Sequence, residues 1–327
     1  MKKFMKTCGV IALILLGCGG AMLIAGCALA GTDGIRQAVD KATDGKVQVT
    51  IDSIGDGISS AFGGFKENVD SIMEEEIYSV EDYGISYDDS KEILTGNVEK
   101  GRIKCGDISA LRVEAGGCDF RIEESQDDGF WIEAENVDKL QAYSEGDALR
   151  IISNRSGKVV NEDIKRVRVI LYVPADYAFD SAILELGAGN LSASELNAGT
   201  AELNVGAGHI ALENLKSENT ILGIGAGGIE IKKIQTGELS CDAGAGGAEI
   251  RGSVDGDCNI TCAVGGVSLV LENDEKEFDY RLDCTMGHIS LGKHEYTGLA
   301  REKKIDNDGD KKMELNCSLG NISVKFE

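Results

Sequence analysis

Residues Leu184–Ile231 read LELGAGNLSASELNAGTAELNVGAGHIALENLKSENTILGIGAGGIEI, and this stretch decides the fold. Its apolar residues alternate on both sides of a Gly-Ala-Gly step that recurs every 19 residues. The phrase occurs seven times in the chain, with corner glycines at Gly189, Gly208, Gly227, Gly246, Gly265, Gly287 and Gly320. The last two intervals are 22 and 33 residues. A fixed period of this size is typical of a solenoid, in which each repeat is one coil stacked on its neighbours.

Four positions of the repeat are apolar in every copy: five and three residues before the corner glycine, and two and four after it. The spacing of two within each arm is the period of a β-strand. Because the parity shifts across the glycine, the chain must bend there to keep both arms facing one interior. In three copies Leu196, Leu215 and Ile234 add a shorter third face. The sequence therefore predicts an all-β, single-stranded parallel β-solenoid (β-helix) with coils of about 19 residues.

The position after the corner glycine holds only Gly, Asn or His. These residues are Asn190, His209, Gly228, Gly247, Gly266, His288 and Asn321. Because all three types are enriched at positive φ, we predict a left-handed conformation in this column. On that basis we interpret His209 and His288 as corner residues rather than metal ligands or general bases.

The N-terminus carries a membrane-targeting pattern. Lys2, Lys3 and Lys6 precede an uncharged stretch that runs from Thr7 to Thr32. About 20 apolar residues span a bilayer, and the lysines would stay on the cytoplasmic side. We therefore expect a signal or transmembrane anchor over residues 1–30, with the rest of the chain outside the cytoplasm at the cell membrane.

Two forms of this anchor remain open. One is an uncleaved signal-anchor helix that crosses the membrane once. The other is a lipid anchor, because Ile24-Ala25-Gly26-Cys27 resembles the lipobox of bacterial lipoproteins, in which the cysteine is acylated. Residues 31–100 are expected to form a linker with possible helical segments. Residues 101–327 would form the solenoid, with 101–180 as its first, irregular coils and 181–327 as its regular repeats.

Several segments resemble a known family. They are RVEAGGCDFRIEES, WIEAEN, LRIIS and VRVILYVPADYAFDSAILELGAGNLSASEL, and the resemblance spans Lys104 to Glu327. They are similar to the bacterial putative-adhesin family, a domain of β-strand repeats with unknown function. The resemblance implies a single-stranded β-solenoid on a membrane-anchored, exported protein, and it supplies no catalytic residues. The chain departs from the family in its inward cysteines and in an insertion from Lys293 to Lys312.

The composition limits which partners the protein can bind and which cysteines can form disulfides. The net charge of −23 argues against nucleic acid as a partner, because no basic stripe is present to neutralise phosphates. Beyond residue 30 the chain has seven cysteines, an odd number. Cys262, Cys284 and Cys317 share an inward column, where a thiol packs as a small apolar group. One disulfide between neighbouring coils remains open.

The sequence shows no motif for a cofactor or a catalytic centre. Aromatic residues make up only 5% of the chain, and acidic residues are scattered over the outward positions. Asp306, Asp308 and Asp310 are weak calcium candidates, with Glu314 beyond them. Their spacing does not match an EF-hand loop, so we interpret them as a polar loop. We expect no catalytic residues, no cofactor and no other metal site.

The sequence therefore predicts a non-enzymatic, membrane-tethered protein of the cell surface, an adhesin or envelope scaffold. Its flat faces or the 293–312 loop would bind a surface protein or a glycan. One alternative is an envelope-stress or signalling accessory that acts through the anchor and linker. A second alternative is a carbohydrate-active β-helix enzyme, whose outward carboxylates would be essential for turnover of a glycan.

Overall fold

The computed structural model describes residues 87–154, 166–297 and 302–327. The expected anchor, Cys27 and the linker up to residue 86 lie outside these residues. The described part is almost entirely β-structure, and its one helical element is a short 3-10 helix, η2 (Glu275–Glu277). No helix in the described ranges is long and apolar enough to cross a membrane.

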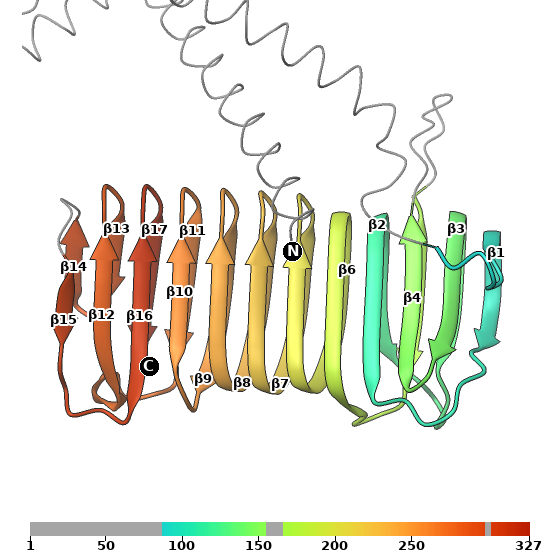
Figure 1. Ribbon diagram of the computed structural model, residues 1–327, viewed down its shortest axis with the longest axis horizontal. Coiled ribbons are helices and arrows are strands. Elements are labelled where there is room, and N and C mark those ends of the chain that lie inside the picture. Colours follow the sequence, from blue (N-terminus) through green and yellow to red (C-terminus); the bar gives the residue numbers. More distant parts are fainter. Residues whose placement is uncertain (1–86, 155–165, 298–301) are drawn as a thin grey trace, which may run out of the picture. The chain divides into compact units, whose positions relative to one another are not determined.

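The central repeats pair in parallel, and paired residues are 19 positions apart in the chain, which is the period of the sequence. The strands are β6 (Ala178–Val205), β7 (His209–Ile224), β8 (Gly228–Ala243) and β9 (Gly247–Val254). Leu203 of β6 pairs with Leu222 of β7, which in turn pairs with Cys241 of β8. Successive repeats therefore stand side by side, as Figure 1 shows.

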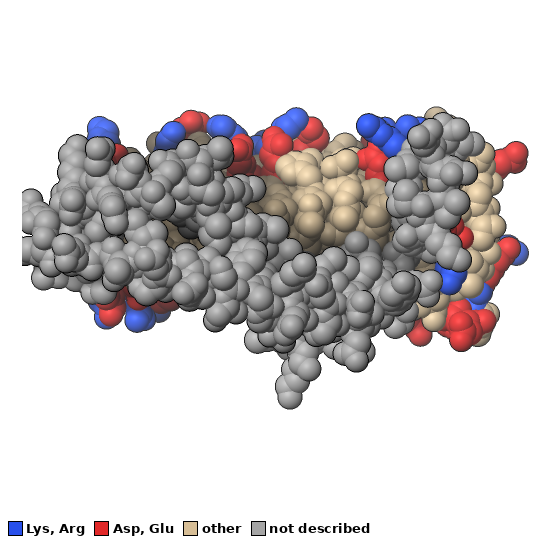
Figure 2. Space-filling model, turned by 90° about the horizontal axis from the view of Figure 1, so that it is seen from above, with Lys and Arg blue, Asp and Glu red and all other residues tan. Residues whose placement is uncertain are grey.

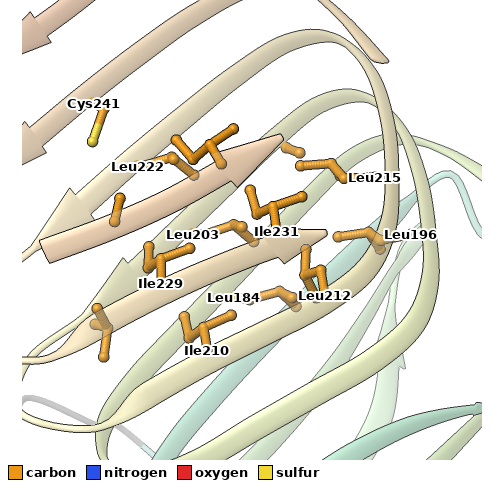
Figure 3. Close-up of a cluster of buried hydrophobic side chains, with 14 of the residues drawn as sticks. Leu184, Leu196, Leu203, Ile210, Leu212, Leu215, Leu222, Ile229, Ile231 and Cys241 are labelled. Carbon is orange, nitrogen blue, oxygen red and sulfur yellow. The ribbon is translucent and has the colours of Figure 1, made fainter. Parts of the chain in front are cut away.

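The apolar columns form the core between the two arms of each repeat. In Figure 3 one column runs through Leu184, Leu203, Leu222 and Cys241, and each of these side chains is at most 1% exposed. The third face of Leu196, Leu215 and Ile234 is also buried. Burying one Leu or Ile side chain contributes roughly 1.5–3 kcal/mol, so a column of them supplies much of the driving force for stacking.

The N-terminal part of the sheet is mixed in direction. β2 (Ala110–Glu124) pairs in parallel with β6 and with β4 (Ala148–Asn154) and β5 (Arg168–Val173). In contrast, β3 (Trp131–Glu145) runs antiparallel to β4, to β5 and to β1 (Leu94–Arg102). The strands of residues 101–180 are therefore not successive coils, and β1 begins before the boundary expected at residue 101.

The C-terminal repeats do not follow chain order. They are formed by β10 (Cys258–Cys262) with β11 (Gly266–Leu271), β12 (Phe278–Cys284) with β13 (His288–Leu291), and β16 (Lys311–Cys317) with β17 (Asn321–Phe326). β16 pairs with both β10 and β12, and β17 pairs with both β11 and β13. The last repeat is thus inserted between the two that precede it in the chain. β14 (His294–Thr297) and β15 (Lys303–Ile305) add antiparallel strands to β13 and β12.

The prediction of a single-stranded parallel β-solenoid is therefore wrong. A solenoid adds coils in chain order through parallel pairing, whereas this chain combines antiparallel strands at both ends with an inserted last repeat. The physical reason is that all repeats bury the same columns, so the apolar pattern specifies the register of a pair but not which repeats are neighbours. The anchor helix that was expected to precede the solenoid lies outside the described residues.

The predicted left-handed column after the corner glycines is also wrong. Among the described residues, positive φ occurs at the corner glycine Gly189 but at no member of that column. The corner glycines serve close packing instead. A Cβ atom at Gly208 would lie 2.5 Å from the carbonyl oxygen of Gly189, and one at Gly320 would lie 2.5 Å from that of Gly265. Successive corners therefore stack backbone on backbone with no room for a side chain.

Candidate functional site

The corners of the repeats form one continuous edge of the sheet, which we call the corner edge. Each repeat contributes the corner glycine and the two residues before it. In spatial order these are residues 187–189, 206–208, 225–227, 244–246, 263–265, 318–320 and 285–287. None of the residues in these triplets is charged. The corner edge lies at the top of Figure 1.

The backbone of the corner edge is held by hydrogen bonds from repeat to repeat. The N–H of Ala226 donates to the carbonyl oxygen of Gly206 at 2.7 Å, and the N–H of Val264 donates to that of Gly244 at 2.9 Å. The ladder of the strands thus continues around the corner. As a result, the middle residue of each triplet is presented at a fixed spacing of about 4.8 Å.

One end of the corner edge carries large apolar side chains. The middle residue is alanine in the first four repeats, but it is Val264, Leu319 and Met286 in the last three. Their exposed fractions are 59%, 55% and 70%, and they are three of the five large apolar side chains exposed among the described residues. The N–H of Leu319 donates to the Ala263 oxygen at 2.7 Å, and that of Met286 donates to the Ser318 oxygen at 2.8 Å. The three residues therefore stand in one row, which we call the apolar tip.

Charged side chains border the corner edge. Figure 2 views this edge from above, and the stretch that is visible there is uncharged, with charged residues along its margin. Beside it, Gly228, Gly247 and Gly266 leave a shallow hollow of about 340 Å³ that is also lined by His209, Glu230 and Glu249. The Nε2 atom of His209 lies 3.9 Å from the Glu230 carboxylate. Charged and ionisable side chains thus lie directly beside this part of the uncharged corner edge.

The backbone N–H groups of the acidic loop donate to Asp306 within the loop and to Asp279 of β12. The carboxylate of Asp306 accepts the N–H of Asp308 at 3.1 Å. The carboxylate of Asp279 accepts the N–H groups of Asn307 and Gly309 at 2.9 and 3.1 Å. In the described residues, no group of three or more His, Cys, Asp or Glu side chains is arranged to hold a metal ion. The calcium candidates Asp306, Asp308 and Asp310 are thus not brought together as a ligand set.

The three histidines, His209, His288 and His294, do not lie together in one site. His209 begins β7 and His288 begins β13, on repeats that are not neighbours. His294 begins β14, where it pairs with Leu291. These positions give no common site for general-base chemistry.

The cysteines beyond Cys105 line the interior. Cys118, Cys241, Cys258, Cys262, Cys284 and Cys317 are buried, and the structure holds them as thiols. Burial raises the pKa of the Cys241 and Cys118 thiols to about 12. Because the thiolate is the reactive form, burial lowers the reactivity of these groups at neutral pH.

The apolar tip was not identified from the sequence. Its signal was present, because the position before the corner glycine changes from Ala to Val264, Met286 and Leu319 in the last three repeats. The continuity of the row was not visible, since Leu319 reaches its place between the other two only through the insertion of the last repeat.

The family of the chain follows from the same repeats. The model of the Toastrack DUF4097 family matches residues 108–261 and 182–325, which together span more than half of the chain. The chain belongs to the Toastrack DUF4097 family. This match confirms the resemblance to the putative-adhesin family. Toastrack is a domain of unknown function. No curated protein matches the chain.

Several solved structures are similar to this Toastrack protein. A putative adhesin from Bacteroides fragilis is 10% identical, with a TM-score of 0.36, and the match covers 73% of this chain and 100% of that one. A putative adhesin from Parabacteroides distasonis is 13% identical, with a TM-score of 0.33 and coverage of 72% and 98%. A putative lipid binding protein from the same species is 18% identical, with a TM-score of 0.38 and coverage of 71% and 98%.

Proposed function

We propose that this Toastrack domain is the outward-facing part of a membrane-tethered protein and that it binds a surface protein through its corner edge. The observation that carries the proposal is the row of Val264, Leu319 and Met286. Exposed apolar side chains that gather within a polar border are typical of a binding surface.

A protein partner fits the apolar tip better than a glycan does. Val, Leu and Met side chains gain free energy when they are covered by another apolar surface. Sugar hydroxyls need hydrogen-bonding partners, which these side chains do not offer. The rigid ladder beneath the tip supports binding further, because little conformational entropy is lost when a preorganised surface is covered.

The placement outside the cytoplasm rests on the N-terminal sequence. The three lysines before the uncharged stretch support a cytoplasmic N-terminus and an exported domain. With the domain at the outer surface, the corner edge would act in adhesion or in an envelope scaffold.

The proposal treats the domain as non-enzymatic. Several outward carboxylates make ion pairs with the neighbouring repeat: Glu213 lies 2.6 Å from Lys232, and Glu185 lies 3.5 Å from Arg112. Such pairs fit a solvated protein surface. This part of the proposal would be overturned if the wild type hydrolysed a glycan and the Glu230→Gln/Glu249→Gln variant did not.

Adherence of whole cells tests the binding role. Cells that produce the full chain are compared with cells that produce Leu319→Lys/Met286→Lys on surfaces coated with collagen, fibronectin or mucin. Ile221→Lys is the matched control, because Ile221 is 43% exposed but lies on a strand face away from the tip. We expect adherence to be lost in the double variant and retained in the control.

Two results would oppose the proposal. Equal adherence of the double variant and the wild type would show that the apolar tip is not the binding surface. Adherence no greater than that of cells without the chain would overturn the adhesin role and favour a scaffold role. Photocross-linking from position 319 in the same cells then distinguishes a scaffold with a partner from a surface without one.

A further inference from the structure

Three buried cysteines become neighbours through the insertion of the last repeat. In the chain they occur in the order Cys262, Cys284, Cys317. In the sheet, Cys317 of β16 pairs with Cys262 of β10 on one side and with Cys284 of β12 on the other. All three face the interior, with exposed fractions of 0%, 3% and 5% for Cys262, Cys317 and Cys284. Cys317 is therefore the middle member of a row of three thiols.

The spacing of this row suits a disulfide at either side of Cys317. Residues paired across parallel strands lie about 4.8 Å apart, within the Cα separation of roughly 4.4–6.8 Å that disulfides span. Cys262 and Cys284 are two strand spacings apart, about 9.6 Å, which is too far for a direct bond. Only bonds that include Cys317 are possible without moving a strand.

The sulfur atoms of Cys262 and Cys317 lie close to the corner glycine of the neighbouring repeat. A Cβ atom at Gly320 would lie 2.5 Å from the Sγ atom of Cys262, and a Cβ atom at Gly287 would clash with the Sγ atom of Cys317. Gly320 belongs to the repeat of Cys317, and Gly287 belongs to the repeat of Cys284. The sulfurs of Cys262 and Cys317 are therefore both directed toward the repeat that holds the next cysteine.

We propose that Cys317 is the centre of a redox site that holds one disulfide at a time, to Cys262 or to Cys284. On oxidation two S–H bonds break and one S–S bond forms. The two electrons and two protons go to a thiol oxidant, such as diamide or the disulfide of an oxidoreductase, which becomes reduced. The disulfide fastens the inserted repeat covalently to one of its neighbours.

The third cysteine allows the disulfide to move. Its thiolate attacks the sulfur of Cys317, a new S–S bond forms, and the former partner leaves as a thiolate that takes up the proton. The attacking, central and leaving sulfurs must be nearly in line, and a straight column of the ladder supplies this arrangement. Burial raises the pKa of the Cys262 and Cys317 thiols, so the exchange is slow at neutral pH and accelerates as the pH rises.

Peptide mapping of the oxidised full chain tests the site. The folded protein is treated with diamide, the remaining thiols are alkylated, and tryptic peptides are identified by mass spectrometry. The three cysteines lie in separate peptides, 252–276, 282–293 and 313–325. We expect peptide 313–325 to be linked to 282–293 in some molecules and, through Cys262, to 252–276 in others. A link between Cys262 and Cys284, or alkylated 313–325 as the only product, would overturn the proposal.

Alanine variants separate the redox site from a general effect of oxidation. Cys317→Ala should abolish both links, and the fold should tolerate it because Ala243 occupies the same column in another repeat. Cys262→Ala should leave only the link to Cys284. Cys241→Ala, in a different buried column, should leave both links. Oxidation should raise the melting temperature of the wild type and of Cys241→Ala but not that of Cys317→Ala; a rise in Cys317→Ala would contradict the site.

Discussion

A corner glycine and a glycine that follows a corner differ in what they would meet if they carried a side chain. At Gly208 a Cβ atom would lie 2.5 Å from the Gly189 oxygen and 2.8 Å from the Cδ2 atom of Leu186, whereas at Gly266 the nearest atom is 3.9 Å away. The same substitution therefore has different consequences at two positions of one repeat pattern.

We expect Gly208→Ala to lower the free energy of unfolding by roughly 1–3 kcal/mol, because the backbone of the preceding repeat must shift to admit the methyl group. Gly266→Ala is the control and should stay within about 0.5 kcal/mol of the wild type. Urea unfolding measures both. Equal losses in the two variants would show that close stacking is not the reason for the corner glycines.

The inward columns are tested by a buried charge. Ile229 is 2% exposed, and the adjacent Glu230 faces outward. Ile229→Asp should unfold the domain, because a carboxylate without a partner in the core costs several kcal/mol. Glu230→Gln should leave circular dichroism and the melting curve nearly unchanged. A native melting curve for Ile229→Asp would contradict the column assignment.

At the scale of elements, one ion pair joins η2 to the start of the inserted repeat. The Nζ atom of Lys311 in β16 lies 2.6 Å from the Glu277 carboxylate and also donates to the Val254 oxygen at 3.3 Å. The hydrogen bond from Lys311 is the largest cause that lowers the pKa of Glu277 to about 2. Lys311 thus connects β16 to η2 and to the end of β9.

This pair gives the stability a dependence on pH. Because the pKa of Glu277 is lower in the folded chain than its usual value of 4.5, its contribution is present above pH 4.5 and is lost as the pH falls toward 2. We expect Glu277→Gln to be less stable than the wild type at pH 7, with a smaller difference at pH 3. Urea midpoints at the two pH values measure this. A difference that grows at pH 3 would show that the carboxylate is not stabilising.

The elements also show what the sequence can and cannot specify. The structure pairs Leu111 and Phe120, which alternate with polar residues around Gly116-Gly117, with Ala182 and Leu191 of the first regular repeat. In contrast, nothing in the pattern of β3 distinguishes an antiparallel strand from a further repeat. The inward side chains were predictable because a period of two determines which face of a strand each side chain occupies. Which repeats become neighbours depends instead on the path of the chain through the last two intervals, of 22 and 33 residues.

The candidate site was less accessible to sequence reasoning than the core. The loop at Asp306 drew attention because clustered carboxylates are a familiar motif, yet the Asp306 carboxylate accepts the backbone N–H of Asp308. The apolar tip has no motif at all. It arises from three single residues that meet only after the last repeat is in place, so its prediction requires the topology.

At the scale of the whole protein, the proposed N-terminal anchor can be tested directly. We expect the full chain, produced in a Gram-positive host, to be recovered in the membrane fraction with its N-terminus intact. Intact mass spectrometry checks this. A mass that begins at a diacylated Cys27 would instead show a lipoprotein, and partner helices within the bilayer would then be excluded as a route of signalling.

The insertion of β16 and β17 also has a consequence for biogenesis. A ribosome releases β10 to β13 before the strands that must separate them, so the two repeats can pair with each other prematurely through identical columns. Completing the native order then requires that this pairing opens, or that it is delayed until the last repeat has emerged. Such non-local closure slows folding. The protein would therefore reach its native state only after synthesis of this region is finished, which would suit the export of an unfolded chain that we propose.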